Sequence, residues 1–144
     1  MPPFRLIPDV NVLLSGVTSD RGPARALYLA ARRFEVTFVL SEGHFQELRR
    51  VLTYPEVLRL GRGITASDAF GLAVELHEVA EVVRRVDRFD WPSCPDPKDW
   101  YLLDLFVAAQ PDAVVTRDNH LLRLQDELEI PVLEPKDLVR LGWV

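Results

Sequence analysis

The stretch Arg5-Leu6-Ile7-Pro8-Asp9-Val10-Asn11-Val12-Leu13-Leu14 is the starting point for interpreting this chain. A short apolar run ends on an aspartate, and apolar residues resume directly after it. Such a run is typical of a buried strand in a parallel sheet. A carboxylate there is costly to bury without a partner, and ligands bind at the carboxyl ends of strands in open α/β sheets. Asp9 is therefore the first candidate for a chemical role.

Length and composition indicate one globular domain, residues 1–144, with enough apolar residues for a sizeable core. No apolar run reaches the length of a membrane span, and the first residues do not form a signal peptide. The single Cys94 excludes an internal disulfide and has no neighbouring zinc ligands, which indicates a cytoplasmic protein. A net charge of −5 argues against nucleic-acid binding by bulk charge but not against a local basic groove.

Predicted strands and helices alternate along the chain. We expect strands at residues 4–8, 35–40, 113–116 and 130–133, with an extended stretch at 82–86. We expect helices at residues 24–33, 41–53, 67–80, 99–110, 119–124 and 135–141. Ser15-Gly16 should lead into a polar loop, and residues 87–99 should form a loop rich in proline and aspartate. This order predicts an α/β fold whose parallel sheet is covered by helices on both faces.

Four acidic residues from separate segments converge on one edge of the predicted sheet. Asp9 and Asp118 each follow a strand, Asp99 begins a helix, and Glu47 lies in the second turn of a helix that follows a strand. Two further acids lie close to these positions in the sequence, Asp96 and Asp104. Like charges gathered in this way raise one another's pKa, and a divalent cation relieves that cost. Hard oxygen ligands favour Mg²⁺ or Mn²⁺ over zinc.

Each acid alone also has a simpler explanation. Asp99 and Asp118 could cap the helices that follow them, and Glu47 could pair with a neighbouring arginine. Asp9 is the hardest to explain in this way, because apolar residues flank it on both sides. Together the four indicate metal-assisted phosphodiester hydrolysis. The chain contains no phosphate loop, no dinucleotide-binding glycine pattern and no serine nucleophile elbow.

Four segments of the chain resemble, in order and spacing, the motifs of PIN-domain nucleases. The first is Asp9 to Ser15, and the second is the helix at 41–52 that carries Glu47. The third is Asp96-Pro97-Lys98-Asp99, and the fourth is the run at 113–122 with its Thr-x-Asp pattern. The resemblance extends over about residues 4–135. Within this family the chain is similar to the VapC-like toxins of bacterial and archaeal toxin–antitoxin systems.

The resemblance implies a three-layer α/β/α sandwich with a central parallel sheet and a Mg²⁺- or Mn²⁺-dependent endoribonuclease. It assigns metal binding and catalysis to four acids, Asp9, Glu47, Asp99 and Asp118. It gives auxiliary roles at the same site to Asn11, Ser15 and Thr116, and we keep as further auxiliary candidates Asp96 and Asp104. It also implies an RNA substrate, a homodimer and, for a toxin, an antitoxin protein as partner. One departure is Val10, where the family usually has a hydroxyl residue.

Two further expectations concern RNA and the alternatives to catalysis. Candidate phosphate contacts are Arg49, Arg50, Arg59 and Arg62, which could equally be solvated surface charges. A phosphatase of the haloacid dehalogenase type would need an acid where this chain has Asn11. A degenerate PIN fold that binds RNA or a protein without cleaving it is the main alternative. Metal binding separates that alternative from a nuclease.

Overall fold

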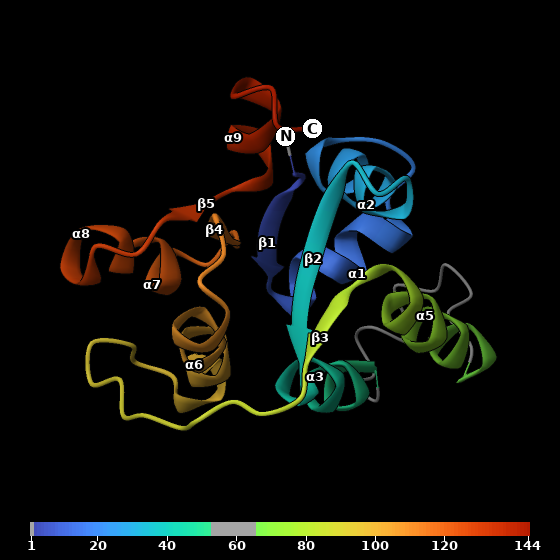
Figure 1. Ribbon diagram of the computed structural model, residues 1–144. Coiled ribbons are helices and arrows are strands. Elements are labelled where there is room, and N and C mark those ends of the chain that lie inside the picture. The colour runs from blue at the N-terminus through green and yellow to red at the C-terminus, as the bar shows by residue number, and fades with distance from the viewer. Residues whose placement is uncertain (1, 53–65) are drawn as a thin grey trace.

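Helices and strands alternate along the chain in the computed structural model, which describes residues 2–52 and 66–144 (Figure 1). In the first half lie β1 Phe4–Pro8, α1 Val10–Thr18, α2 Pro23–Arg32, β2 Val36–Ser41, α3 Glu42–Leu52 and α5 Ala66–Val79. In the second half lie β3 Glu81–Val83, the 3-10 turn η1 Pro97–Asp99, α6 Trp100–Ala109, β4 Ala113–Val115, α7 Asn119–Leu122, α8 Leu124–Leu128, β5 Val132–Leu133 and α9 Pro135–Arg140. None of the described helices has the length and apolar character needed to cross a membrane.

The five strands form one parallel sheet in the order β3-β2-β1-β4-β5. The first strand is central: Leu6 of β1 pairs with Phe38 of β2 on one side and with Ala113 of β4 on the other. Because all strands run the same way, their carboxyl ends lie at one edge of the sheet. Helices cover both faces, so the predicted α/β/α sandwich with a central parallel sheet is confirmed.

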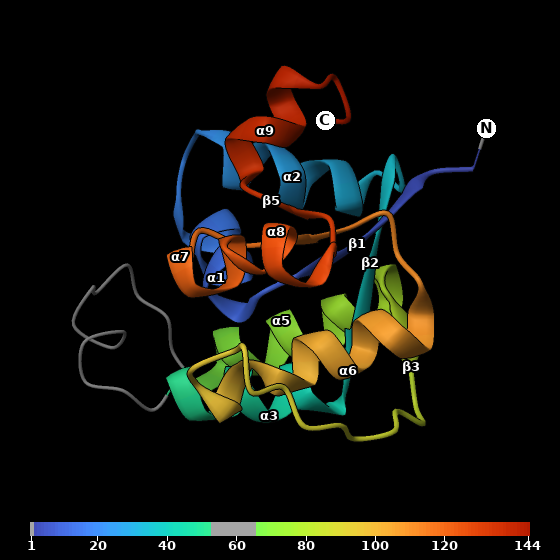
Figure 2. The same cartoon turned by 90° about the vertical axis from the view of Figure 1, so that its left-hand side faces the viewer.

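Alternate residues of the strands build two separate cores, as the period of a strand requires. Leu6 of β1 and Phe38 of β2 face the core shared with α1, α2, α3, α5 and α9. Ile7 and Val39 face the opposite core, which is shared with α6, α7 and α8. Figure 2 shows these last three helices in front of the sheet and α5 behind it. The carboxyl ends of β1 and β4 therefore lie among four helices, α1, α3, α6 and α7.

The first helix differs from the expectation for this part of the chain. Ser15 and Gly16 do not begin a loop, because α1 continues through them to Thr18. Gly16 has a packing role: a Cβ atom there would lie 2.8 Å from the carbonyl oxygen of Ala24 and 2.8 Å from the Cβ of Tyr28. The missing side chain lets α2 pack closely against α1. The helix α1 was not predicted, whereas the polar loop expected after Ser15-Gly16 is present between Thr18 and Pro23. A glycine that serves close packing looks the same in sequence as one that ends a helix.

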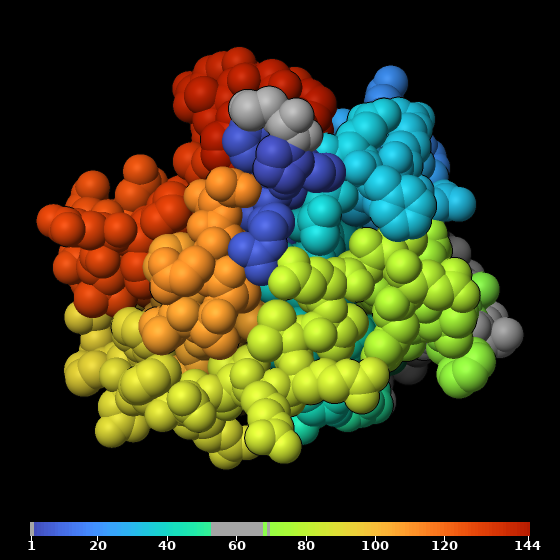
Figure 3. Space-filling view, in the orientation of Figure 1, coloured from blue at the N-terminus to red at the C-terminus, as the bar shows by residue number. Residues whose placement is uncertain are grey.

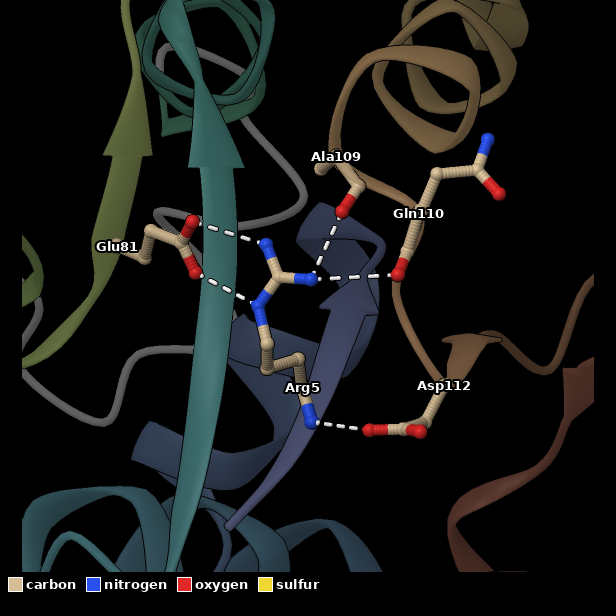
Figure 4. Close-up of polar contacts among 5 residues, drawn as sticks. All are labelled: Arg5, Glu81, Ala109, Gln110 and Asp112. Carbon is tan, nitrogen blue, oxygen red and sulfur yellow. Dashed lines mark hydrogen bonds and ion pairs between the residues drawn. The ribbon is translucent and has the colours of Figure 1, made fainter. Parts of the chain in front are cut away.

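Arg5 fastens the opposite, amino-terminal edge of the sheet (Figure 4). Its Nε and Nη2 atoms each donate to the carboxylate of Glu81, at 2.9 Å, where β3 begins. Its Nη1 atom donates to the carbonyl oxygens of Ala109 and Gln110 at the end of α6, at 2.8 and 3.2 Å. The backbone N–H of Arg5 donates to Asp112, just before β4, at 2.7 Å. One guanidinium thus fixes three elements relative to one another, and it places positive charge at the carboxyl end of a helix, where the helix dipole favours it.

Candidate active site

Asp9 lies where β1 passes directly into α1. Its backbone N–H still belongs to the sheet and donates to the carbonyl oxygen of Val115 at 2.9 Å. Its side chain already belongs to the helix, because Oδ1 accepts from the N–H of Val12 at 2.8 Å and caps α1. The residue is only 8% exposed. Burial raises the pKa of this carboxyl, and the negative charge of Asp118 adds to that shift.

Thr116 joins Asp9 to Asp118 through one hydroxyl group. The Thr116 Oγ1 donates to Oδ2 of Asp9 and accepts from the backbone N–H of Asp118 at 3.0 Å. Thr116 is fully buried, so water does not compete for the hydrogen bonds of its hydroxyl group. The Asp118 side chain caps the short helix α7 by accepting from the N–H of His120 at 2.8 Å. The expected capping role of Asp118 is thus present, and it holds the carboxylate at the edge of the sheet beside Asp9.

Asp99 is the acid whose charge is least compensated. It stands at the start of α6, yet its side chain makes no capping hydrogen bond. Its pKa is raised from 3.8 to about 6, first by burial and then by the negative charges of Asp118, Asp96, Asp9 and Glu47. The simpler explanation of Asp99 as a helix cap therefore fails. Asp99 therefore lies within electrostatic reach of the other three predicted acids.

Glu47 is paired with an arginine on its own helix. Arg50 Nε donates to Oε2 of Glu47 at 2.9 Å, and Arg50 Nη2 donates to Oε1. This pairing raises the pKa of Arg50, and the nearby negative charge of Asp96 adds to it. Arg50 therefore supplies positive charge beside Glu47 and in the vicinity of Asp96.

Two aromatic rings connect the helices that carry these acids. Gly43 in α3 lies against the ring of Tyr101 in α6, since a Cβ atom on Gly43 would be 2.6 Å from Tyr101 Cδ2. The Tyr101 ring also meets the imidazole of His44 edge to face, with centroids 5.0 Å apart. His44 Nδ1 accepts from the N–H of Ser41 at 3.1 Å, so its Nε2 carries the proton that bonds the carbonyl oxygen of Pro8 at 2.8 Å. These contacts fix α3 and α6 to the end of β1.

His44 is neutral in this setting, because burial lowers its pKa to about 4. Its side chain is 1% exposed, so it is not available to a substrate. The imidazole holds the carbonyl group immediately before Asp9 and thereby positions the first acid.

The comparison with protein families agrees with this geometry. A model described as PIN domain matches residues 5–120, which run from β1 into the start of α7 and include all four acids. The chain belongs to the PIN-domain family. PIN domains are generally nucleases and typically use divalent metals. Among curated protein sequences none matches this chain.

The acids of this PIN domain have the donor chemistry of a site for a hard cation. All four supply carboxylate oxygens, which Mg²⁺ and Mn²⁺ prefer. Asp9 is buried and Asp99 is half-buried, and the negative charge of Asp118 repels both. A cation would therefore lower the free energy needed to keep these two carboxylates charged. Within residues 2–52 and 66–144, no three His, Cys, Asp or Glu side chains approach closely enough to hold a metal ion. The carboxylates are therefore gathered but not arranged as a closed coordination shell.

The auxiliary candidates of the PIN domain have different surroundings. The backbone N–H of Asn11 donates to Asp9, while its side chain is exposed. Ser15 Oγ accepts from Arg117 Nη1 at 3.0 Å. Asn11 and Ser15 therefore lie on α1, the helix that Asp9 caps. Thr116 lies on the segment after β4 that carries Asp118.

Asp96, in the loop before α6, and Asp104, within α6, have separate tasks. Asp96 caps the turn η1 by accepting from the N–H of Lys98 at 3.0 Å. Oδ1 of Asp104 accepts from the N–H of Phe89 at 3.0 Å and from the indole of Trp91 at 2.8 Å. Asp104 is thus used to hold the loop, and we leave it out of the metal-binding set proposed below.

The four arginines considered for RNA binding are not equally available. Arg49 Nη2 lies 3.1 Å from Oε1 of Glu42, and Arg50 is bound to Glu47 as described above. Arg59 and Arg62 lie outside the described residues. Sequence reasoning overlooked two other arginines, Arg84 and Arg88, which follow β3 and line a cavity beside Tyr101.

Proposed function

We propose that this PIN domain is a Mg²⁺- or Mn²⁺-dependent endoribonuclease that hydrolyses RNA phosphodiester bonds. The observation that carries the proposal is the gathering of four carboxylates from β1, α3, α6 and the end of β4, with the pKa of Asp99 raised to about 6. Membership of a family whose members are generally nucleases supports it. Asp9, Glu47, Asp99 and Asp118 would hold the cation.

Each residue of the site has a task in this proposal. When bound, a divalent cation lowers the pKa of an attacking water and neutralises charge on the phosphate. Asp9 and Asp118 are held in place through the Thr116 hydroxyl, so their geometry is set before any ligand arrives. Asp99 makes no capping bond and is free to turn toward a cation. Glu47 has to loosen its two contacts with Arg50 before it binds a cation.

The experiment is a cleavage assay on single-stranded RNA with Mg²⁺ or Mn²⁺. Wild type should cleave the RNA, EDTA should stop it, and Asp9→Asn should lower the rate by at least about a hundredfold, in line with loss of a metal ligand. The control Asp126→Asn removes an exposed carboxylate from α8 and should cleave like wild type. Equal cleavage by wild type and Asp9→Asn after rigorous purification would mean that the activity is a contaminant.

A PIN fold that binds without cleaving is the second candidate, and two observations favour it. Glu47 is already neutralised by Arg50, and the described residues contain no ready-made metal cluster. Calorimetric titration with Mn²⁺ separates the two functions. A nuclease should show EDTA-reversible binding that Asp9→Asn weakens, and a melting temperature that rises with the Mn²⁺ concentration. A degenerate module should show neither effect.

We also propose that the protein acts in the cytoplasm as the toxin of a toxin–antitoxin pair and as a homodimer. The support is the resemblance of its four motifs to those of VapC-like toxins. The antitoxin would be established by two findings together. A short neighbouring gene should encode a small DNA-binding protein, and that protein should co-purify with this chain. Light scattering on the purified protein gives the oligomeric state, and a monomer at all concentrations would contradict the dimer.

A further inference from the structure

A cavity of about 570 Å³ lies beside Tyr101, and none of the four acids is among the residues that line it. It is enclosed by the first turn of α3, by the segment that follows β3, and by the first half of α6. Figure 3 shows the segment after β3, in yellow-green, along the lower surface of the molecule. Its volume falls in the usual range for sites that bind small molecules or cofactors. The lining residues used below are Gln46, Arg84, Arg88, Phe89, Asp90 and Tyr101.

The cavity and the candidate active site share a wall. The ring of Tyr101 lines the cavity, and its phenol lies within electrostatic reach of Asp9, Glu47 and Asp99. Gln46, which also lines the cavity, directly precedes Glu47 in α3. The cavity thus adjoins α3, which carries Glu47, and the start of α6, where Asp99 lies.

Two cations at the rim are available to phosphate groups. Arg84 and Arg88 are exposed, and within the described part of the chain neither has a carboxylate within 4.0 Å. This distinguishes them from Arg49 and Arg50, which are both engaged with glutamates. The guanidinium group suits phosphate because its fork of donors matches two phosphate oxygens.

The cavity also offers what the rest of a nucleotide requires. Phe89 is 46% exposed, although its backbone N–H is fastened to Asp104, so its ring stands at the surface on a fixed backbone. Exposed aromatic rings stack with nucleobases of any sequence. Asp90 and Gln46 supply acceptors for the amino groups of bases.

We propose that this cavity binds a nucleotide of the RNA strand next to the phosphate that is cleaved. Arg84 and Arg88 contact its phosphates, and Phe89 stacks on its base. The inference rests on the proposed ribonuclease function, since it names how that site holds its substrate. It also adds residues from the segment after β3, and that segment contains none of the four acids.

Binding is measured by fluorescence anisotropy with a labelled single-stranded RNA in EDTA, on the Asp9→Asn protein, so that the probe stays intact. Adding Arg84→Ala and Arg88→Ala should weaken binding at least about tenfold. It should also reduce the slope of log affinity against log salt by about 1.4, that is about 0.7 for each lost phosphate contact. Adding Phe89→Ala should weaken binding by about fivefold or more with the salt slope unchanged.

The matched control is the pair Arg21→Ala and Arg33→Ala, which removes two exposed arginines near the ends of α2 and gives the same change in net charge. Equal losses in the control and in the Arg84 and Arg88 variant would overturn the inference, because bulk charge would then explain the binding. So would a Phe89→Ala variant that binds like the parent protein.

A cleavage assay on the same substitutions in the wild-type background separates this inference from the proposed function. If wild type cleaves RNA and the Arg84 and Arg88 variant binds and cleaves equally well, only the nucleotide site is wrong. If no protein cleaves but the cavity variants selectively lose RNA binding, the nucleotide site stands and the nuclease does not.

Discussion

Replacing Asp99 with asparagine should stabilise the metal-free protein at neutral pH. The pKa of Asp99 is about 6 in the folded protein and 3.8 ordinarily, because of burial and then the charge of Asp118 and its neighbours. Between these two values the folded protein binds more protons than the unfolded chain, so its stability falls as the pH rises through that interval. Asparagine has nearly the same shape and no charge. Wild type should therefore lose stability relative to the variant between about pH 4 and pH 6.

The size of this effect follows from the same two pKa values. The interval from 3.8 to about 6 corresponds to roughly 3 kcal/mol at about 1.36 kcal/mol per pH unit. Asp99 is only half-buried, and solvent screens part of the interaction, so we reduce this figure to about 1–2 kcal/mol. The two proteins should differ least below pH 4, where the carboxyl is protonated in both the folded and the unfolded state.

The assay is urea unfolding in EDTA, followed by the fluorescence of the three tryptophans, at intervals from pH 4 to pH 8. Only the difference in unfolding free energy between Asp99→Asn and wild type is used, because the pKa of Asp9 is raised in both proteins. Asp126→Asn controls for the general loss of one negative charge. A difference between Asp99→Asn and wild type that does not change with pH would refute the argument that the acids repel one another at this site.

Three substitutions test packing and hydrogen bonding at the two edges of the sheet, each by urea unfolding. Gly43→Ala should cost about 1–3 kcal/mol, because the new methyl group meets Tyr101 at 2.6 Å, whereas Gly71→Ala in α5 meets nothing within 4 Å and should be neutral or stabilising. Thr116→Val should cost about 2–4 kcal/mol, because it removes the partner of Asp9 and of a backbone N–H, and Thr116→Ser should recover most of that loss. Arg5→Met should cost about 1–2 kcal/mol through the lost contacts with Glu81 and the end of α6, and an unchanged midpoint would show that water replaces them.

Much of the fold follows from local sequence patterns. The apolar run before Asp9 and the run before Asp118 each identify a buried parallel strand, and the strand ends bring both acids to one edge. The helix α1 was not predicted, because Gly16 packs against Ala24 and Tyr28, a contact between two helices that periodicity does not reveal. The short helix α8 was not predicted either, since five residues carry too little periodicity to distinguish a helix from a turn.

Details of the site depend on contacts that spacing does not specify. The order of the acids along the chain was enough to expect Asp99 near Asp118, but not to know that Asp99 makes no capping bond. Asp104 looked like a spare ligand until its bonds to Phe89 and Trp91 were seen, because a side chain on a helix can face either the acids or the loop. The only sequence signal for Arg84 and Arg88 was the gathering of three arginines, at 84, 85 and 88, directly before Phe89.

The hydroxyl of Thr116 has a consequence for how the protein is made. It closes a contact with Asp9 across 107 residues of sequence, and β4 inserts beside β1 only when that stretch has been synthesised. Contacts between distant parts of a chain form late, because a long loop must first be closed. A chain emerging from the ribosome therefore lacks the candidate active site until nearly the whole family region, residues 5–120, is available. For the ribonuclease proposed above, this order of assembly would delay activity until translation has passed the site's last acid.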